Sequence, residues 1–288
     1  MDVSERRACK TTSQPRATQR YQALQADKDK PLVSKIKKLA QKHRRYGYRM
    51  ITALLRADGW RVNRKRVYRI WRQEGLKVPH KQVKRRRLGC SGNSCVRQKA
   101  RHINHVWSYD FLMDQTEDGK ALKLLPVLDE YTRECLSIDV QRSITARDVI
   151  STLEYLFAVR GAPQYIRSDN GPEFIADAIK SWLARSGVGT LYIEKGSPWE
   201  NAYSESFNSR FRDEFLNGES FATVKEAKVL VESHRLDYNH HRPHSSLKYA
   251  TPAAFAATCL ASAPASAGPS PSPNRTQSVD NSLITVGT

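Results

Sequence analysis

From Val106 onward the sequence changes from helical spacing to short apolar runs separated by turn residues. The first three runs follow one another with only turns between them, which predicts consecutive antiparallel strands at residues 106–113, 122–128 and 135–140. Further along the chain, strands are expected at residues 165–168 and 190–193. Helices are expected at residues 145–159, 172–186, 200–216 and 223–238. Hairpin strands followed by strand–helix units predict an α/β fold with a mixed five-stranded sheet flanked by helices.

The part of the chain before these strands has the spacing of helices. Apolar residues recur every three or four positions at residues 32–40 and again at 48–57, and Asn63 is a preferred cap for a third helix that ends before Gly75. Three short helices joined by short turns predict an all-α, helix-turn-helix-like domain at residues 31–78.

Charge is distributed very unevenly along the chain. Residues 1–105 contain 30 Lys+Arg and 6 Asp+Glu, whereas the remainder contains 18 and 23, so the net charge of +19 comes from the first part. Such an excess usually has an anionic polymer or surface as its partner. The distribution indicates a nucleic-acid-binding region joined to a region that gathers carboxylates.

The third predicted helix carries most of the cations expected to contact DNA: Arg64, Lys65, Arg66, Arg69 and Arg72. Five cations on one short helix repel one another, and phosphates relieve that repulsion while counterions are released. The alternative is a solvated surface helix. Residues 79–101 read as a basic linker, either a tether or a segment that follows a DNA backbone through Lys84, Arg85, Arg86 and Arg87.

Three carboxylates occur in local sequence patterns that suit catalytic, metal-binding residues. Asp110 follows an apolar strand pattern, Asp169 precedes an Asn-Gly-Pro turn into a helix, and Glu205 lies on a helix with Asn201, Asn208 and Arg212 on the same face. A lone Asp is normally a turn cap or an ion-pair partner, but three such positions rarely coincide. Carboxylates supply the hard oxygens that hold two Mg²⁺ or Mn²⁺ ions about 3.5 to 4 Å apart. We expect Asp110, Asp169 and Glu205 to be catalytic and metal-binding, and the polar stripe to contact DNA.

Five segments carry a resemblance to a known family: residues 107–111 (WSYDF), 128–133 (LDEYTR), 168–174 (SDNGPEF), 197–208 (SPWENAYSESFN) and 238–247 (YNHHRPHSSL). In this order they resemble the catalytic core of bacterial insertion-sequence transposases of the third family, which is related to retroviral integrases. The likeness spans residues 32–255. It implies a ribonuclease-H-like fold with Asp110, Asp169 and Glu205 as the acidic triad. Ala202 stands where members of that family commonly have Gly.

The resemblance implies metal-dependent DNA cleavage and strand transfer on double-stranded DNA, at the element's terminal inverted repeats and at target DNA. It also implies a homo-oligomer on DNA, and an upstream-frame protein as a further partner. One alternative is a non-catalytic DNA-binding repressor or assembly factor made from the second frame alone. A simple nuclease is a third reading, against which the helical DNA-binding domain counts.

The segment 238–247 contains three histidines, His240, His241 and His244, which could suggest metal ligands or a catalytic base. Together with Asn239 and Arg242 they favour instead a turn that packs on the core or touches DNA.

The remaining features concern domain limits and location. We expect a polar basic lead-in at residues 1–30, the catalytic core with its C-terminal helices at 102–258, and a disordered Ala/Ser/Pro-rich tail at 259–288. No run of about 18 apolar residues suggests a membrane span. Five cysteines without framework spacing indicate reduced thiols, so a cytoplasmic protein without a membrane partner is expected, nucleoid-associated when bound to DNA.

Overall fold

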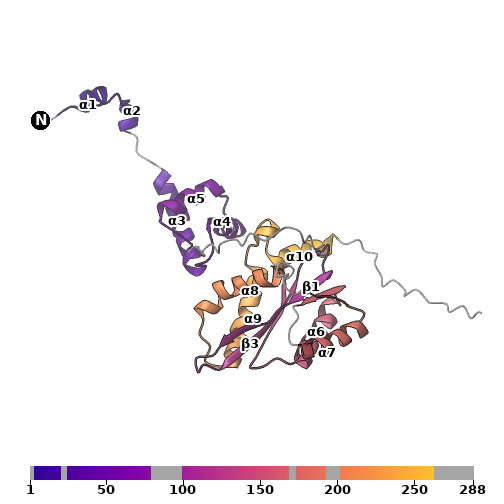
Figure 1. The fold of residues 1–288 in the computed structure, drawn as a ribbon. Helices are drawn as coiled ribbons and strands as arrows, with labels where there is room; N and C mark the ends of the chain where they lie inside the picture. Colours follow the sequence, from indigo (N-terminus) through magenta and orange to yellow (C-terminus); the bar gives the residue numbers. More distant parts are fainter. Residues whose placement is uncertain (1–2, 21–24, 79–98, 169–172, 193–201, 263–288) are drawn as a thin grey trace, which may run out of the picture.

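The described chain has a helical region followed by a larger sheet-containing region. The computed structural model describes residues 3–20, 25–78, 99–168, 173–192 and 202–262. Two short helices, α1 (Glu5–Thr11) and α2 (Arg16–Gln19), come first. The helical region then consists of α3 (Gln25–Lys42), α4 (Tyr48–Ala57) and α5 (Arg64–Gln73), which lie together beside the sheet-containing region (Figure 1).

The three helices predicted for this region are confirmed, and each contributes apolar residues to one core. The core residues with almost no exposed surface are Leu32, Ile36, Ile51, Leu55, Val67 and Ile70. The Asn63 side chain caps α5 by accepting a hydrogen bond of 2.9 Å from the Lys65 amide. Since α3 begins at Gln25, the helical region starts before the predicted limit at residue 31.

The sheet of the second region is mixed, as predicted. Its strands are β1 (Val106–Tyr109), β2 (Leu112–Gln115), β3 (Ala121–Asp129), β4 (Cys135–Gln141), β5 (Tyr165–Ser168) and β6 (Gly189–Tyr192). β3 pairs with β1, β2 and β4 in antiparallel fashion, whereas β1, β5 and β6 are parallel to one another. This order, with helices on both faces, is the ribonuclease-H-like arrangement expected from the sequence.

Among the described residues the sheet has six strands where five were predicted, because the first predicted strand is interrupted at Asp110. β1 and β2 keep one register along β3, since Tyr109 lies opposite Val127 and Leu112 opposite Leu124. That register puts Asp110 opposite Pro126. Proline has no amide hydrogen to donate, so the hydrogen-bond ladder is broken at this point.

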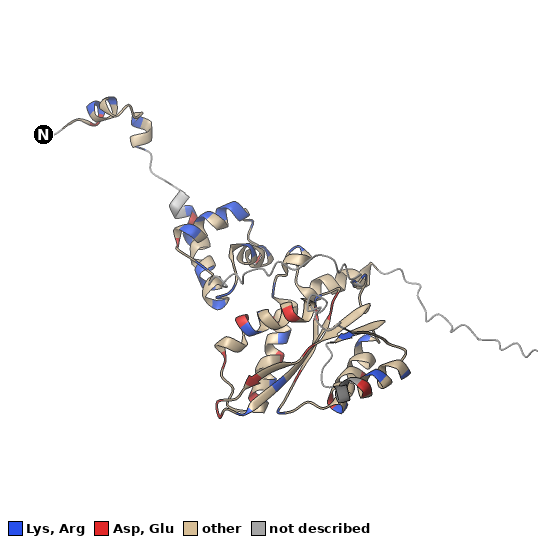
Figure 2. Cartoon of the chain, in the orientation of Figure 1, with Lys and Arg blue, Asp and Glu red and all other residues tan. Residues whose placement is uncertain are grey.

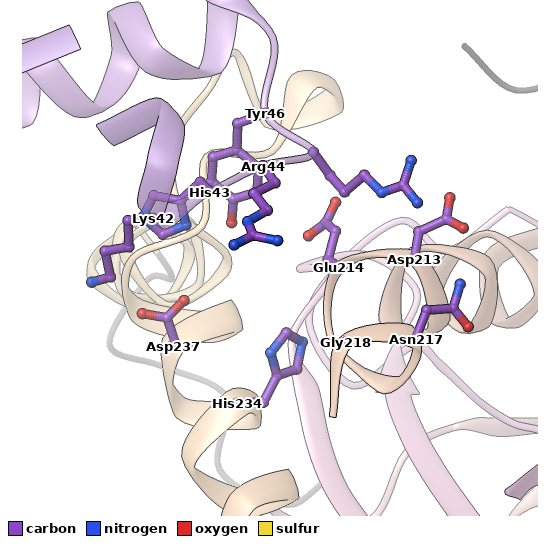
Figure 3. Close-up of a pocket in the computed structure, with 11 residues that line it drawn as sticks. Lys42, His43, Arg44, Tyr46, Asp213, Glu214, Asn217, Gly218, His234 and Asp237 are labelled. Atoms are coloured by element: carbon purple, nitrogen blue, oxygen red, sulfur yellow. The ribbon is translucent and has the colours of Figure 1, made fainter. Parts of the chain in front are cut away.

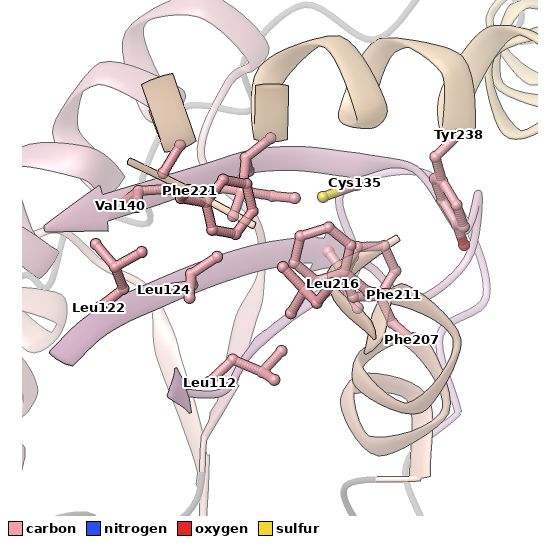
Figure 4. Close-up of a cluster of buried hydrophobic side chains, with 14 residues drawn as sticks. Leu112, Leu122, Leu124, Cys135, Val140, Phe207, Phe211, Leu216, Phe221 and Tyr238 are labelled. Carbon is pink, nitrogen blue, oxygen red and sulfur yellow. The ribbon is translucent and has the colours of Figure 1, made fainter. Parts of the chain in front are cut away.

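Helices cover the two faces of the sheet in separate pairs (Figure 1). α6 (Ala146–Arg160) and α7 (Glu173–Arg185) pack on one face with Trp107 and Ile166. α8 (Ala202–Glu214) and α9 (Val224–His240) pack on the other, where Phe207, Phe211 and Tyr238 meet the apolar side of β3 and β4 (Figure 4). The second layer therefore holds the predicted Glu205 helix against the sheet.

The C-terminal part contains short elements that the sequence did not predict. These are the 3-10 turns η2 (Leu216–Gly218) and η3 (Ser245–Leu247) and the helix α10 (Pro252–Ala261). Thr251 caps α10 by accepting a hydrogen bond of 3.3 Å from the Ala254 amide. α10 passes the predicted start of the tail at residue 259. None of the helices in the described part of the chain is long and apolar enough to cross a membrane.

Candidate functional site

Asp110 stands at the break between β1 and β2, on the face of the sheet that α8 covers. Trp107 and Tyr109 point into the core under α6 and α7, so the alternation of a strand directs Ser108 and Asp110 to the opposite face, as predicted. Asp110 is half-buried. Its Oδ2 accepts a hydrogen bond of 2.8 Å from Nδ2 of Asn208 on α8. A strand position and a helix position 98 residues apart therefore meet at one carboxylate.

α8 presents two different surfaces to the sheet region. Ser204, Phe207 and Phe211 are buried against the core. The adjacent flank carries the predicted polar stripe of Glu205, Asn208 and Arg212, about one turn apart along the helix. Arg212 donates a hydrogen bond of 3.0 Å to the Met113 carbonyl of β2, so this flank follows the β1–β2 segment. Glu205 is exposed in the first helical turn, one turn before the residue that contacts Asp110.

Several predicted site residues lie outside the described residues: Asp169, Asn201, Lys84, Arg85, Arg86 and Arg87. Ser168, which directly precedes Asp169 in the sequence, ends β5. In the parallel register of β1 and β5, Ser108 lies opposite Arg167, and the next pair in that register is Tyr109 with Ser168. In the part of the chain that the structure describes, no three His, Cys, Asp or Glu residues are grouped to hold a metal ion.

The five cations predicted on α5 fall into two groups. Arg66 and Arg69 both donate to the buried carboxylate of Asp29 on α3, at 2.8 Å and 2.5 Å. Asp29 thus relieves part of the repulsion among the α5 cations, which was the reason for predicting that this helix contacts DNA phosphates. Arg64, Lys65 and Arg72 are exposed and remain the DNA-contact candidates of this helix. Figure 2 shows the concentration of Lys and Arg over α3, α4 and α5. The sequence signal for Asp29 is its location one turn before the first apolar residues of α3.

A hollow of about 390 Å³ separates the loop between α3 and α4 from α8 and α9 (Figure 3). Its walls mix Lys42, Arg44 and Arg45 with Asp213, Glu214 and Asp237. Tyr46 is buried at this junction, with the Arg242 guanidinium 5.7 Å from its ring centroid. None of the predicted site residues lines the hollow. It marks the contact between the helical region and the sheet region and, because its charges are mixed, it does not indicate an anionic ligand.

The sequence matches known families over most of its length. Residues 100–198 and 186–252 match models described as integrase core domain, and residues 26–86 match one described as HTH-like domain. The chain is 37% identical over 273 residues to the insertion element IS407 uncharacterized 31.7 kDa protein of Burkholderia multivorans, which covers 93% of this chain and 95% of that protein. It is 38% identical over 258 residues to the insertion element IS476 uncharacterized 39.2 kDa protein of Xanthomonas euvesicatoria, covering 88% and 73%.

More distant sequence similarity agrees with these matches. The transposase for insertion sequence element IS904 of Lactococcus lactis is 29% identical over 237 residues, which covers 78% of this chain and 92% of that protein. Among solved structures, the HTLV-2 integrase catalytic core domain in complex with magnesium has a TM-score of 0.43 and 15% identity, covering 54% of this chain and 97% of that one.

An integrase core preceded by an HTH-like domain defines a class of proteins that act on DNA, and both domains indicate DNA as the partner. The chain belongs to the insertion-sequence transposases with an integrase core domain. Its family chemistry is polynucleotidyl transfer. The predicted transposase function is confirmed, and the alternative of a non-catalytic repressor or assembly factor is not favoured.

Proposed function

We propose that this transposase cleaves and joins DNA at a divalent-metal site formed by Asp110, Asp169 and Glu205. The observation that carries the proposal is the hydrogen bond from Asn208 to Asp110. It holds the polar flank of α8, which bears Glu205, against the break in the central strand. Asp169 follows the last residue of β5, whose neighbour in the sheet is β1.

The side chains at this place suit a hard cation. Asp110 and Glu205 supply carboxylate oxygens, and the buried Oδ1 of Asn208 has no hydrogen-bond partner among the described residues. Oxygen donors of this kind are those that Mg²⁺ and Mn²⁺ prefer. Two bound ions would supply activation of the attacking hydroxyl or water and stabilisation of the leaving oxygen.

The protein side chains have separable tasks in this proposal. Asn208 orients the Asp110 carboxylate by donating to its Oδ2. Glu205 lies in the first turn of α8, one turn before Asn208, so it faces the same side of the helix as the residue that contacts Asp110. Arg212 ties the same flank of α8 to β2, so the two carboxylates keep their relative positions when DNA binds.

The substrate proposed is double-stranded DNA carrying the element's terminal inverted repeats, with a second DNA as target. Arg64, Lys65 and Arg72 present exposed charge for backbone phosphates, and the linker cations Lys84, Arg85, Arg86 and Arg87 extend that surface in the sequence. Because two DNA ends must be joined to one target, we include a homo-oligomer on DNA and, as a further partner, the upstream-frame protein.

The test is a joining assay with the full chain, Mg²⁺ and labelled duplexes that end in the terminal repeat. The wild type is expected to give nicked and joined products, and Asp110→Asn to reduce both by at least about a thousandfold, the scale of losing an essential catalytic group. The matched control is Asp114→Asn, because Asp114 lies on β2 and accepts a hydrogen bond from the Gln115 amide. Equal joining by Asp110→Asn and the wild type would refute the proposal. DNA binding without any nicking by the wild type would favour a repressor.

A further inference from the structure

Three of the segments that carry the family resemblance meet at one pocket, which Asp110 and Glu205 of the proposed metal site do not line. The pocket has a volume of about 200 Å³ and lies between the end of β3, one flank of α8 and the turn at residues 244–246. The side chains used in the argument are Arg133, Tyr203, Ser206, Arg210, His244 and Ser246. The proposed metal site explains none of these residues.

Arg133 is held in a conformation that few residues other than glycine adopt. Its φ of 66° places it in the left-handed region, where backbone strain is common at functional sites. The turn is fixed by Asp129, whose Oδ1 accepts from the amides of Tyr131 at 2.7 Å and Thr132 at 3.0 Å. The Arg133 guanidinium then lies 3.8 Å from the centroid of the Tyr203 ring. Its Nη1 is buried without a hydrogen-bond partner in the described structure.

Arg210 brings a second cation into the pocket. It is half-buried, and no hydrogen bond or ion pair joins it to another described residue. The carboxylate one helical turn later, Glu214, is already taken by Arg242, which donates to both of its oxygens at 2.6 Å and 2.5 Å. Burial, with a smaller contribution from the charge of Arg242, lowers the pKa of Arg210. Within the described residues the cation is therefore poorly solvated and unpaired.

The acidic residues at the pocket do not neutralise these arginines. Asp129 is surrounded by amide donors, with Oδ2 accepting from Asn104 at 2.8 Å in addition to the bonds to Oδ1. Glu130 forms a fully buried ion pair with Arg167 at 2.9 Å. Burial and three nearby arginines lower the pKa of His244 to about 3, so its ring is neutral, and its Nδ1 shares a hydrogen bond of 2.9 Å with Oγ of Ser246. A bound anion would balance the positive charge of Arg133 and Arg210 and would accept a hydrogen bond from the unpaired Nη1 of Arg133.

We propose that this pocket binds a phosphate group of the DNA backbone through Arg133 and Arg210, with Ser206 as a neutral hydrogen-bond donor and Ser246 as a second donor whose Oγ accepts from Nδ1 of His244. The binding of a phosphate rests on DNA being the substrate, and only the position of that phosphate along the strand refers to the proposed metal site. Planar guanidinium groups suit phosphate oxygens, and Tyr203 holds one of them in place.

The geometry of α8 places the phosphate relative to the proposed metal site. Tyr203, Ser206 and Arg210 lie on the flank of α8 opposite the flank of Glu205 and Asn208. The two flanks are separated by one helix diameter, about 10 to 12 Å. A DNA strand advances about 3.4 Å per nucleotide along the helix axis, and because the strand also winds around that axis, its successive phosphates are further apart than this. The bound phosphate should therefore lie within about three nucleotides of the one at Asp110.

The experiment is a scan of DNA binding by the full chain in EDTA, which separates binding from cleavage. Duplexes end in the terminal repeat, and each phosphate near the end is replaced singly by a neutral methylphosphonate. For the wild type, one position within about three nucleotides of the cleaved phosphate is expected to weaken binding about tenfold when its charge is removed, as for loss of a charged hydrogen bond. In Arg133→Met/Arg210→Met that position should have no further effect.

The control is Arg147→Met, which removes the same charge from an exposed position on α6, across the sheet. It should keep the wild-type scan. If the methionine variants unfold at a lower temperature than the assay, Arg133→Lys and Arg210→Lys replace them and should reduce, without abolishing, the effect of that position.

Other outcomes overturn the proposal. An undiminished tenfold effect in the arginine variants would mean that other residues hold that phosphate. If the arginine variants keep the wild-type scan but no longer self-associate in sedimentation, the pocket would be assigned to an acidic side chain of a second copy. Because the scan is made in EDTA, a failed metal site would abolish joining by the wild type without changing the scan, whereas a failed phosphate site would change the scan, so the two failures are distinguishable.

Discussion

Glu214→Gln is expected to be among the most destabilising single changes in the sheet region. The side chains of Glu214 and Arg242 are 12% and 6% exposed, and two hydrogen bonds join them. A glutamine amide at this position can accept only one of these bonds, and it leaves the buried Arg242 charge without a counterion beside the half-buried Arg210. Breaking one side of a buried pair costs about 3 to 5 kcal/mol, and the retained bond favours the lower end, about 3 kcal/mol.

The assay is urea denaturation of the full chain at about pH 7, followed by far-ultraviolet circular dichroism. The matched control is Glu232→Gln, since Glu232 pairs with Arg235 on the same layer but is 51% exposed, and it should cost less than about 1 kcal/mol. Glu214→Leu combined with Arg242→Met removes both charges and should cost less than Glu214→Gln alone. Equal destabilisation by Glu214→Gln and Glu232→Gln would refute the reasoning.

Three further outcomes are expected. Burial lowers the pKa of His234 to about 4, so the unfolded chain takes up a proton near pH 6.5 that the folded chain does not. As the pH is lowered from about 6.5 to 4, the free energy of unfolding should therefore fall by up to about 1.4 kcal/mol per pH unit. Urea titrations at about pH 7 and 5 should show a smaller fall for His234→Phe than for the wild type. Arg64→Met should lower the slope of log binding constant against log salt by about 0.9, whereas Arg66→Met, whose cation is paired with Asp29, should change it less. Asp29→Asn should destabilise the helical region by about 2 kcal/mol and speed hydrogen exchange of the α4 amides, and unchanged exchange would contradict the structural role of this carboxylate.

Most of the secondary structure follows from local patterns. The strand at residues 165–168 has the same limits in the structure, and Thr145 caps α6 with a capping box that includes Asp148. These features depend on neighbours in the sequence. The break at Asp110 does not, because it follows from the position of Pro126 opposite Asp110, and that position is defined only when the register of β1 and β3 is known. Residues 106–113 alone therefore read as one strand.

In the candidate site, too, some features follow from neighbours in the sequence and others only from the fold. The sequence singles out Asp110, Glu205 and Asn208, and the structure brings Asn208 to Asp110. The sequence predicts Asn208 only as a DNA contact, since nothing local indicates a partner 98 residues away. Arg133 and Arg210 are not singled out by the sequence for the same reason. Their significance depends on which partners the fold assigns: Glu214 is close enough in sequence to pair with Arg210, but the fold gives it to Arg242.

The most direct test of the central claim is whether Asp110 and Glu205 act at one metal site. Fe²⁺ in place of Mg²⁺ reduces added hydrogen peroxide to radicals that cut the polypeptide beside the bound ion, ascorbate returns the iron to Fe²⁺, and the fragments of the full chain are identified by mass spectrometry. The account predicts cuts next to both Asp110 and Glu205, competed by Mg²⁺ and lost together in Glu205→Gln. Cuts next to only one of the two carboxylates, or cuts unaffected by that substitution, would contradict it.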